Sequence, residues 1–408
     1  MPTKVVLLIA KNWPEPNSTA AGRRTLDLLN LFKKAGFEVH IASTAEPTPF
    51  QADFSALSYA THSIKVNDNA FDDWISAFNP TLVIYDRFVM EEQFGWRVKE
   101  QSPKTATLID TSDLHCLRIA REHAFKKDQT LNLFNDIAIR EISAITRCDF
   151  TLMISKVEID LLINKFQIPQ HKCLYLPFLV DQAPQPSLVG FADRQNLVMV
   201  GGFKHEPNRD ATRWLREALW PAMQPLLPKG TQMHVYGAYA DHAMNQLNAP
   251  KNNFYIKGRV DDSMSTVERY RLNLAPLRFG AGQKGKILEG WLTGTPTLTT
   301  PVGAEAMHGA EPPVYKLTNH PDEFARLVAS YYQDEMQWLT LQEDGYRRVR
   351  SNFLSSDHAP KFVEVIIQAI EQLDAHRAKD FWQSLLWQNQ LGSMKYMSRW
   401  IEEKNKQN

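Results

Sequence analysis

The strongest constraint on the fold is the alternation of short apolar runs with amphipathic helical segments. Residues 5–10 form an unbroken apolar run, which is typical of a strand buried on both faces. The segment behind it carries apolar residues at helical spacing, at Leu28, Leu31, Phe32 and Ala35. The strand signal then returns at 38–43, 81–85 and 105–109, with a helical segment at 91–100. This alternation predicts βαβ units, and therefore an α/β fold with a parallel sheet.

A lapse in this pattern divides the chain. At 408 residues the chain is too long for one ordinary core, and residues 181–193 replace the alternation with Pro, Gln and Ser. We interpret 181–193 as a linker between two doubly wound, Rossmann-like domains, 1–180 and 194–375. The strands expected in the second domain are 196–200, 232–236, 254–257, 272–277 and 297–300, with helices at 210–227 and 284–293. The helical tail, 376–408, is expected to pack back on the first domain.

Composition argues against several classes of protein. Lysine plus arginine equals aspartate plus glutamate, 46 each, so the basic excess of a dedicated nucleic-acid binder is missing and no such partner is indicated. The three cysteines are scattered, which argues against a disulfide framework and a structural zinc site. No stretch approaches the ~20 apolar residues of a membrane helix, and the N-terminus lacks a cleavage site. We therefore expect a cytoplasmic protein of undetermined oligomeric state.

The tryptophans of the tail admit two interpretations. Trp382, Trp387 and Trp400 are expected to pack in a core or between the domains. The alternative is a helix at the inner face of a membrane, because basic residues accompany them at Lys395, Arg399 and Lys404. Peripheral membrane association is therefore kept as an alternative to a freely cytoplasmic protein.

The segment 278–290 carries the clearest chemical signal. It follows an expected strand and opens an expected helix, which is where α/β sheets bind ligands. Gly280 and Gly282 let backbone amides approach a ligand closely, and amides at a helix N-terminus favour an anion. Lys284 and Lys286 add positive charge that suits a diphosphate. The segment therefore predicts a phosphate-binding loop.

Glu289 lies one turn further along the same expected helix, where its carboxylate can accept two hydrogen bonds from a ribose diol. The stretch 276–289, continuing through 294–305, looks like the donor-binding signature of family-4 retaining glycosyltransferases, the glycosyl transferases group 1. A second stretch, 200–211, resembles the opening of that family's second domain. The resemblance is specific across about 196–310, and covers the first domain only in its general pattern.

The resemblance implies a GT-B fold, in which two facing Rossmann-like domains hold acceptor and donor between them. It implies that Glu289 binds the donor ribose and that Lys204 and Lys284 meet the diphosphate, Lys284 with a catalytic role. The remaining donor-binding positions are Gly202, Arg259, Val260, Gly280, Gly282 and Lys286. Family members usually carry another glutamate eight positions before Glu289, where this chain has Ala281. How the sugar is held therefore stays open.

The expected chemistry requires neither a metal nor a cofactor. Breaking a sugar–phosphate bond places negative charge on the leaving diphosphate, which lysines and a helix N-terminus can stabilise. Asp261 and Asp262 are adjacent, unlike the DxD pair of metal-dependent transferases, and we interpret them as polar loop residues near the nucleotide base. We expect a nucleotide-diphosphate-sugar donor of undetermined base, no metal, and an unidentified acceptor such as a glycan or lipid-linked saccharide.

Candidate residues of the first domain follow its strand ends. His115 and Asp113 are placed to contact the transferring sugar or to orient the acceptor hydroxyl, and the resemblance implies a histidine at this place. The first β–α loop would lie beneath the diphosphate or the acceptor through Ser18, Thr19 and Gly22. A third candidate segment, 85–87, also follows a strand.

Purely structural roles remain alternatives for these residues. The glycine-rich segment can be a simple turn, Glu289 a partner in an ion pair, and the histidine a packing residue. Lys204 and His205 can form a surface turn before a helix that Asn208 caps. The remaining charges of the first loop, Arg23 and Arg24, are interpreted as solvated residues at a helix start.

Three alternative functions accompany the leading hypothesis, a retaining and metal-independent sugar transfer. A catalytically silent nucleotide-sugar-binding protein would bind nucleotide without turnover. A GT-B hydrolase or epimerase would turn over nucleotide sugars without an acceptor. A dinucleotide oxidoreductase would need GxGxxG after the first strand, and the first β–α loop has only Gly22.

Overall fold

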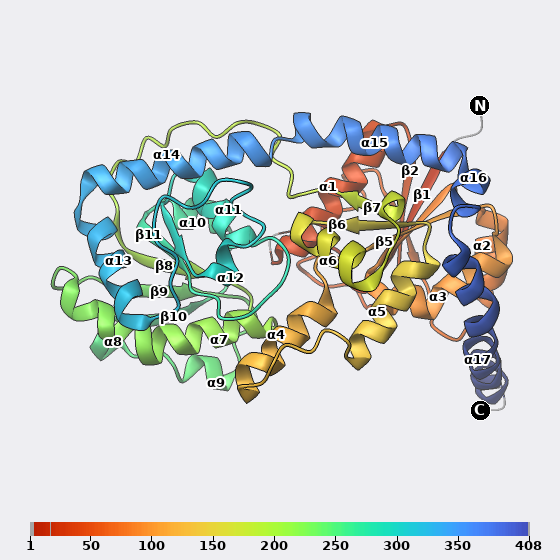
Figure 1. The fold of residues 1–408 in the computed structure, drawn as a ribbon, viewed down its shortest axis with the longest axis horizontal. Coiled ribbons are helices and arrows are strands. Elements are labelled where there is room, and N and C mark those ends of the chain that lie inside the picture. Colours follow the sequence, from red (N-terminus) through yellow and green to blue (C-terminus); the bar gives the residue numbers. More distant parts are fainter. Residues whose placement is uncertain (1–3, 17, 407–408) are drawn as a thin grey trace.

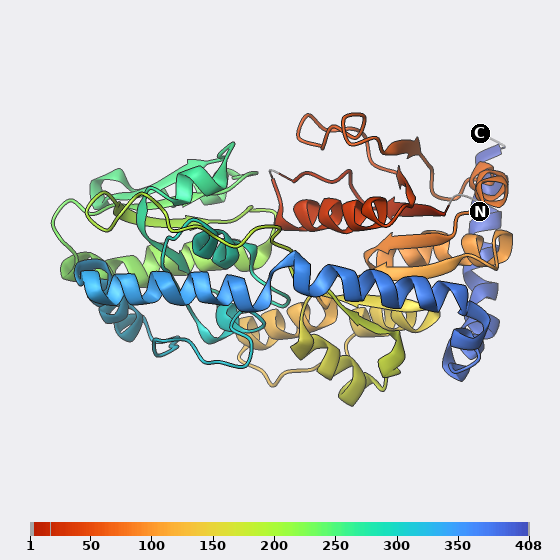
Figure 2. The same cartoon turned by 90° about the horizontal axis from the view of Figure 1, so that it is seen from above.

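The computed structural model describes residues 4–16 and 18–406, apart from the side chains of 389–391. Two parallel sheets lie along the long axis of the molecule, surrounded by helices (Figures 1 and 2). Neighbouring strands in both sheets pair in parallel, so each connection must cross over the sheet, and most of the crossovers contain a helix. The α/β fold class expected from the sequence is confirmed.

The first sheet contains seven strands in the order β3-β2-β1-β4-β5-β6-β7. The strands are β1 (Val5–Ala10), β2 (Glu38–Ser43), β3 (Ala60–Ser63), β4 (Leu82–Asp86), β5 (Ala106–Asp110), β6 (Phe150–Met153) and β7 (Cys173–Tyr175). Their helices are α1 (Ala20–Lys34), α2 (Ala70–Phe78), α3 (Arg87–Gln101), α4 (His115–Lys127), α5 (Asp136–Arg147) and α6 (Lys156–Phe166). Strand β1 is inside the sheet because it is apolar on both faces: Leu8 and Leu7 belong to different buried clusters.

The second sheet contains five strands in the order β10-β9-β8-β11-β12. The strands are β8 (Gln195–Val200), β9 (Met233–Tyr236), β10 (Phe254–Gly258), β11 (Tyr270–Ala275) and β12 (Thr297–Thr299). The helices are α7 (Glu206–Trp214), α8 (Trp220–Met223), α9 (His242–Asn245), α10 (Ser263–Val267), α11 (Gly285–Leu292), α12 (Pro301–Ala304), α13 (Pro321–Gln333) and α14 (Glu335–Asn352). Each strand expected from the sequence in this domain is present, with ends shifted by up to two residues.

The expected helix at 210–227 is a composite of several segments. It begins earlier, at α7, and continues through a π-helical turn, Leu215–Leu219, into α8 and a short 3₁₀ turn. Pro207 fits the first turn of α7, where a helix leaves its N–H groups unpaired. Pro221 has no N–H to continue the ordinary ladder, which accounts for the irregular turn before it.

The chain crosses between the domains twice, and the two crossings are hydrogen-bonded to each other. The Val180 amide donates to the Phe353 carbonyl at 2.8 Å, and the Ser355 amide donates to the Val180 carbonyl at 2.9 Å. Helix α15 (Ser355–Glu371) then runs on from α14 along the side of the first domain (Figure 1). Phe362 and Ile366 of α15 are buried in the core of that domain. The return therefore begins at α15, before the expected start of the tail at residue 376.

Buried charges hold the last helix on the first domain. After α16 (Leu373–Arg377), the chain ends in α17 (Phe381–Lys406), which packs against α3 and α5. The Arg97 guanidinium is 1% exposed and donates to the Asp72 carboxylate at 2.7 Å. It also donates to Ser398 at 3.0 Å and to Glu402, both on α17. The single guanidinium of Arg97 thus pairs with the carboxylates of both Asp72 and Glu402 away from water.

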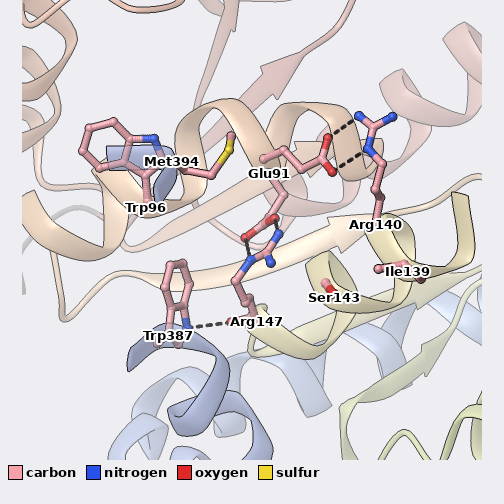
Figure 3. A pocket seen from close by; sticks show the side chains of 9 residues that line it. Glu91, Trp96, Ile139, Arg140, Ser143, Arg147, Trp387 and Met394 are labelled. Atoms are coloured by element: carbon pink, nitrogen blue, oxygen red, sulfur yellow. Dashed lines mark hydrogen bonds and ion pairs between the residues drawn. The ribbon is translucent and has the colours of Figure 1, made fainter. Parts of the chain in front are cut away.

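The tail tryptophans differ in their surroundings. Trp387 is buried and its indole donates to the Arg147 carbonyl at 3.0 Å, beside the Glu91–Arg147 ion pair (Figure 3). A hollow of about 190 Å³ lies here between α3, α5 and α17. Trp382 and Trp400 are exposed, so the expected core packing holds for Trp387 alone. Within the described part of the chain, no helix has the length and apolar character required to span a bilayer.

We expect Arg97→Met to lower the free energy of unfolding by about 3–5 kcal/mol, because two carboxylates would stay buried without their cation. Urea denaturation measures the change, and limited proteolysis shows whether α17 is released first. Arg399→Met is the matched control, since Arg399 lies 3.7 Å from Asp72 and its side chain is 45% exposed. Its expected cost is under about 0.5 kcal/mol. Equal losses in the two variants would contradict the role given to Arg97.

Candidate functional site

Loops that follow the strands of both sheets meet at the junction of the two domains. In the first domain these loops follow β1 and β5, and in the second they follow β8 and β11. A Cβ atom placed on Gly202 would lie 4.0 Å from the Ser18 carbonyl oxygen, and one on Gly282 would lie 2.8 Å from the Asp113 Cβ. Ligands of α/β proteins bind beyond the carboxyl ends of strands, so the junction is the candidate site.

The loop before α11 is built for close backbone approach. Gly280 and Gly282 have φ angles of 153° and 67°, which favour glycine. Lys284 is buried at the start of α11, and its ammonium donates to the Gly282 carbonyl. Burial lowers the pKa of Lys284, while Glu158 and Glu305 oppose that shift. The loop therefore holds a buried cation one residue before a helix N-terminus.

Lys286 supplies a second cation beside this loop. Its ammonium is half-buried and donates to the Asn208 side chain. Burial lowers the pKa of Lys286 to about 8, against the attraction of Glu289. Asn208 also donates to the Gly202 carbonyl at 2.9 Å, whereas His205 stands at the N-cap of α7. The alternative in which Asn208 caps this helix is therefore wrong, and Asn208 instead links the β8 loop to Lys286.

Glu289 faces the first domain from the first turns of α11. Its side chain is 15% exposed, and one carboxylate oxygen lies 3.7 Å from the Arg23 guanidinium. Burial raises the pKa of Glu289, while Arg23 and a hydrogen bond with Ser263 lower it. Arg24 is buried and donates to the Leu176 carbonyl at 2.7 Å, so its interpretation as a solvated charge is wrong.

The three remaining donor-side candidates, Lys204, Arg259 and Val260, lie nearer the surface. The Lys204 ammonium is 3.6 Å from the centre of the Tyr239 ring, and the Tyr239 hydroxyl donates to Glu15 of the first domain at 3.0 Å. Arg259 lies over the Phe50 ring of the first domain at 4.5 Å. Val260 is half-buried beside it, and Asp262 caps α10 by accepting from two backbone amides. These contacts place Lys204 and Arg259 at the rim of the junction.

Asp113 and His115 lie at the start of α4, opposite the glycine-rich loop. Asp113 is paired with Arg118, and burial alone would raise its pKa, but Arg118 and His115 lower it to about 2. The His115 Nδ1 atom is 3.2 Å from Glu141 and 3.9 Å from Asp113. His115 therefore stands between two carboxylates, with one ring nitrogen turned toward Glu141.

Two further residues complete this cluster, and the sequence did not single them out as site residues. Arg118 binds Asp113 from the next turn of α4. His205 of the second domain is exposed, and the charges of Arg118 and Asp113 both act on it. Only folding brings these groups together, since His205 lies in the other domain.

The first β–α loop has mixed roles. Thr19 caps α1 by accepting from the Gly22 amide at 2.9 Å, and a Cβ on Gly22 would lie 2.5 Å from the Glu15 carbonyl oxygen. Ser18 has a buried hydroxyl that lacks a hydrogen-bond partner among the described residues. In the third candidate segment Arg87 binds Asp86, and Tyr85 is buried. Thr19 and Gly22 therefore have structural roles in the loop. The buried Ser18 hydroxyl has no hydrogen-bond partner among the described residues and is the one of the three that a ligand could bind.

Residues 194–334 match the sequence model of the family described as glycosyl transferases group 1. The matched residues lie in the second domain. The match includes the glycine-rich loop, both lysines and Glu289, and it confirms the family indicated by the sequence. No curated protein sequence matches the chain. Among the described residues, no three His, Cys, Asp or Glu side chains are grouped as metal ligands would be.

Solved glycosyltransferase structures share the fold of the whole chain. TarM of S. aureus has a TM-score of 0.69 at 8% identity, over 89% of this chain and 98% of that one. HepE of Anabaena, in complex with UDP-glucose, has a TM-score of 0.68 at 11% identity, covering 89% and 99%. Sucrose-phosphate synthase of Thermosynechococcus elongatus has 0.64 at 14%, covering 91% and 99%. The fold is GT-B, as expected, and the chain covers nearly the full length of these structures.

We expect Gly282→Ala to destabilise the protein more than Gly36→Ala does. Both glycines have positive φ angles, 67° and 86°, but nothing lies within 4 Å of a Cβ on Gly36. The left-handed backbone alone costs about 1–2 kcal/mol. The contact with Asp113 adds about 1–3 kcal/mol at Gly282 only. Thermal unfolding of both variants measures the difference, and equal melting temperatures would show that the domains do not meet at Gly282.

Proposed function

We propose that this glycosyltransferase transfers a sugar from a uridine-diphosphate sugar with retention of configuration and without a metal ion. The observation that carries the proposal is the placement of Lys284, Lys286 and Glu289 on one helix start, opposite Asp113 and His115. Uridine is proposed because similar structures of HepE and TarM were determined with UDP. The acceptor is proposed to be a glycan or a lipid-linked saccharide.

The second domain would bind and stabilise the leaving group, the nucleoside diphosphate. A diphosphate at the N-terminus of α11 would meet free amides and the positive end of the helix dipole. The ammonium groups of Lys284 and Lys286 lie in partly buried surroundings, where a charge interaction is stronger than in water. The carboxylate of Glu289 is placed one turn further on for the ribose diol. Electrostatic stabilisation by these cations would take the place of a metal.

The sugar would lie beside the contact between this loop and the residues that precede α4. A front-face transfer forms the bond from C1 to the acceptor oxygen on the side from which the diphosphate leaves, so the configuration is kept. The acceptor proton passes to the departing phosphate oxygen, and no protein nucleophile is needed. The nearby Asp113 carboxylate is bound by Arg118, which suits a role in holding a hydroxyl rather than attacking carbon. His115 is proposed to orient the sugar or the acceptor beside it.

Thermal stabilisation by UDP, GDP, ADP, CMP and NAD tests the donor site. A ligand at 100 times its Kd stabilises a protein by about 2.7 kcal/mol. We expect a selective shift with UDP, and expect Glu289→Ala to weaken UDP binding by about tenfold to a hundredfold through loss of charge-assisted hydrogen bonds. Glu343→Ala, on the exposed face of α14, is the control and should bind as the wild type does.

The other outcomes separate the alternatives. A shift with NAD alone, or with no nucleotide, would contradict the proposed donor. UDP binding without sugar transfer to any acceptor would favour a silent binding protein. Release of free sugar from UDP-glucose without an acceptor would favour a hydrolase. Unchanged UDP affinity in Glu289→Ala would remove Glu289 from the site.

The lowered pKa of Lys286 predicts that UDP binding weakens as pH rises. Below its pKa of about 8 the side chain is a cation that attracts the diphosphate, and above it the unbound protein must first take up a proton. Affinity should then fall by up to about tenfold per pH unit. Calorimetric titration between about pH 7 and pH 9 measures the profile. Lys286→Arg keeps its charge over this range, so its profile should be flatter; identical profiles would contradict the role of Lys286.

A further inference from the structure

Glu158 joins the two halves of the candidate site. It lies in the first turn of α6, in the first domain, and is completely buried. One carboxylate oxygen accepts from the Leu114 amide at 2.8 Å, immediately before α4. The other accepts from the Gly282 amide of the second domain. A single carboxylate thus binds the loop that carries Asp113 and the loop that would bind the donor diphosphate.

The geometry differs from that of an ordinary helix cap. Glu158 stands three residues after Ser155, whose side chain accepts from the Glu158 amide at 3.3 Å. In a capping box the glutamate side chain would turn back to the amide of the capping serine. Here the carboxylate turns away from its own helix and uses both oxygens on other segments. A structural role in α6 therefore does not account for its orientation.

Gly282 is held through both its backbone N–H and its backbone carbonyl. The Gly282 amide donates to Glu158, and the Gly282 carbonyl accepts from the Lys284 ammonium. Nearby, Arg121 of α4 donates to the Gly280 carbonyl at 2.8 Å and binds Glu305 of the second domain. The backbone of the glycine-rich loop is therefore fixed by side chains of both domains before any donor arrives.

The pKa of Glu158 is raised to about 7, because burial and the neighbouring Asp113 outweigh the Leu114 and Gly282 amides and Lys284, which lower it. A buried carboxylate that lacked these partners would be costly to keep ionised. The hydrogen bonds from these two amides therefore favour the ionised form that burial opposes.

We propose that Glu158 is a positioning residue that holds the donor loop against the Asp113–His115 loop, and so sets where the donor diphosphate lies relative to Asp113 and His115. The proposal rests on the proposed function, because it concerns the two loops of that site. Glu158 would not contact the reacting atoms. It acts through the Gly282 and Leu114 amides, and nucleotide contacts made by the second domain alone should not depend on it.

Glu158→Gln provides an isosteric test. The amide keeps one acceptor oxygen but presents an NH₂ group to the second backbone amide, so one of the two bonds must be lost. Asp160→Asn is the matched control, because Asp160 lies on the exposed face of the same helix. The measurements are amide hydrogen exchange over residues 112–116 and 280–286, the radius of gyration by small-angle X-ray scattering, and the Kd of UDP. Glu158→Asp is the second variant, since it keeps the charge but its shorter side chain cannot reach both amides.

In Glu158→Gln we expect exchange at 280–286 to accelerate at least about tenfold. The radius of gyration should rise, and the Kd of UDP should stay within about threefold of the wild type. The exchange rate and radius of gyration of Glu158→Asp should lie between those of the wild type and of Glu158→Gln. Asp160→Asn should match the wild type in all three measurements. Faster exchange confined to the first domain, with 280–286 and the radius unchanged, would show a merely structural role and overturn the proposal. Failure of the wild type to bind UDP would refute the proposed donor, whereas the exchange and scattering results would still decide the role of Glu158.

Discussion

The close approach of Gly282 to Asp113 is the contact on which the domain junction depends. With a φ of 67° and no side chain, Gly282 brings its backbone to a place where a Cβ would be 2.8 Å from that of Asp113. This proximity lets Glu158 reach the Gly282 amide and lets Arg121 reach the Gly280 carbonyl. The candidate site is thus formed by backbone brought into contact, with side chains from both domains arranged around it.

Charges of both signs lie on each side of the junction. The donor side contributes the cations Lys284 and Lys286, and the facing side contributes the carboxylates of Asp113 and Glu158. Since burying an unpaired charge is costly, each of these groups is tied to a neighbour in the absence of a donor. A bound diphosphate would compete for the same lysines. Donor binding would therefore exchange the present partners of these lysines for the diphosphate, with the same side chains charged before and after.

Much of the fold could be predicted from local sequence. Buried parallel strands are continuous apolar runs, and the helices between them repeat apolar residues every three or four positions. The segments missed were short or amphipathic: β3, β6 and β7 have only three or four residues each. The donor loop could be recognised because its glycines, lysines and Glu289 are neighbours in sequence. Arg118, Glu158 and His205 could not, because their roles depend on partners in another element or another domain. Arg24 carries no sequence sign that it is buried.

The return of α15 to the first domain has a consequence for how the protein folds. Phe362 and Ile366 complete a core whose other members come largely from the first third of the chain, such as Val6, Leu28 and Phe32. During synthesis, part of the apolar surface of the first domain therefore stays uncovered until almost the entire chain has left the ribosome. The second domain draws its sheet and main core from one continuous stretch and can form while the first is still unfinished. The domain made first is thus the last to be completed, and a premature stop before α15 would leave an apolar surface exposed to aggregation or proteolysis.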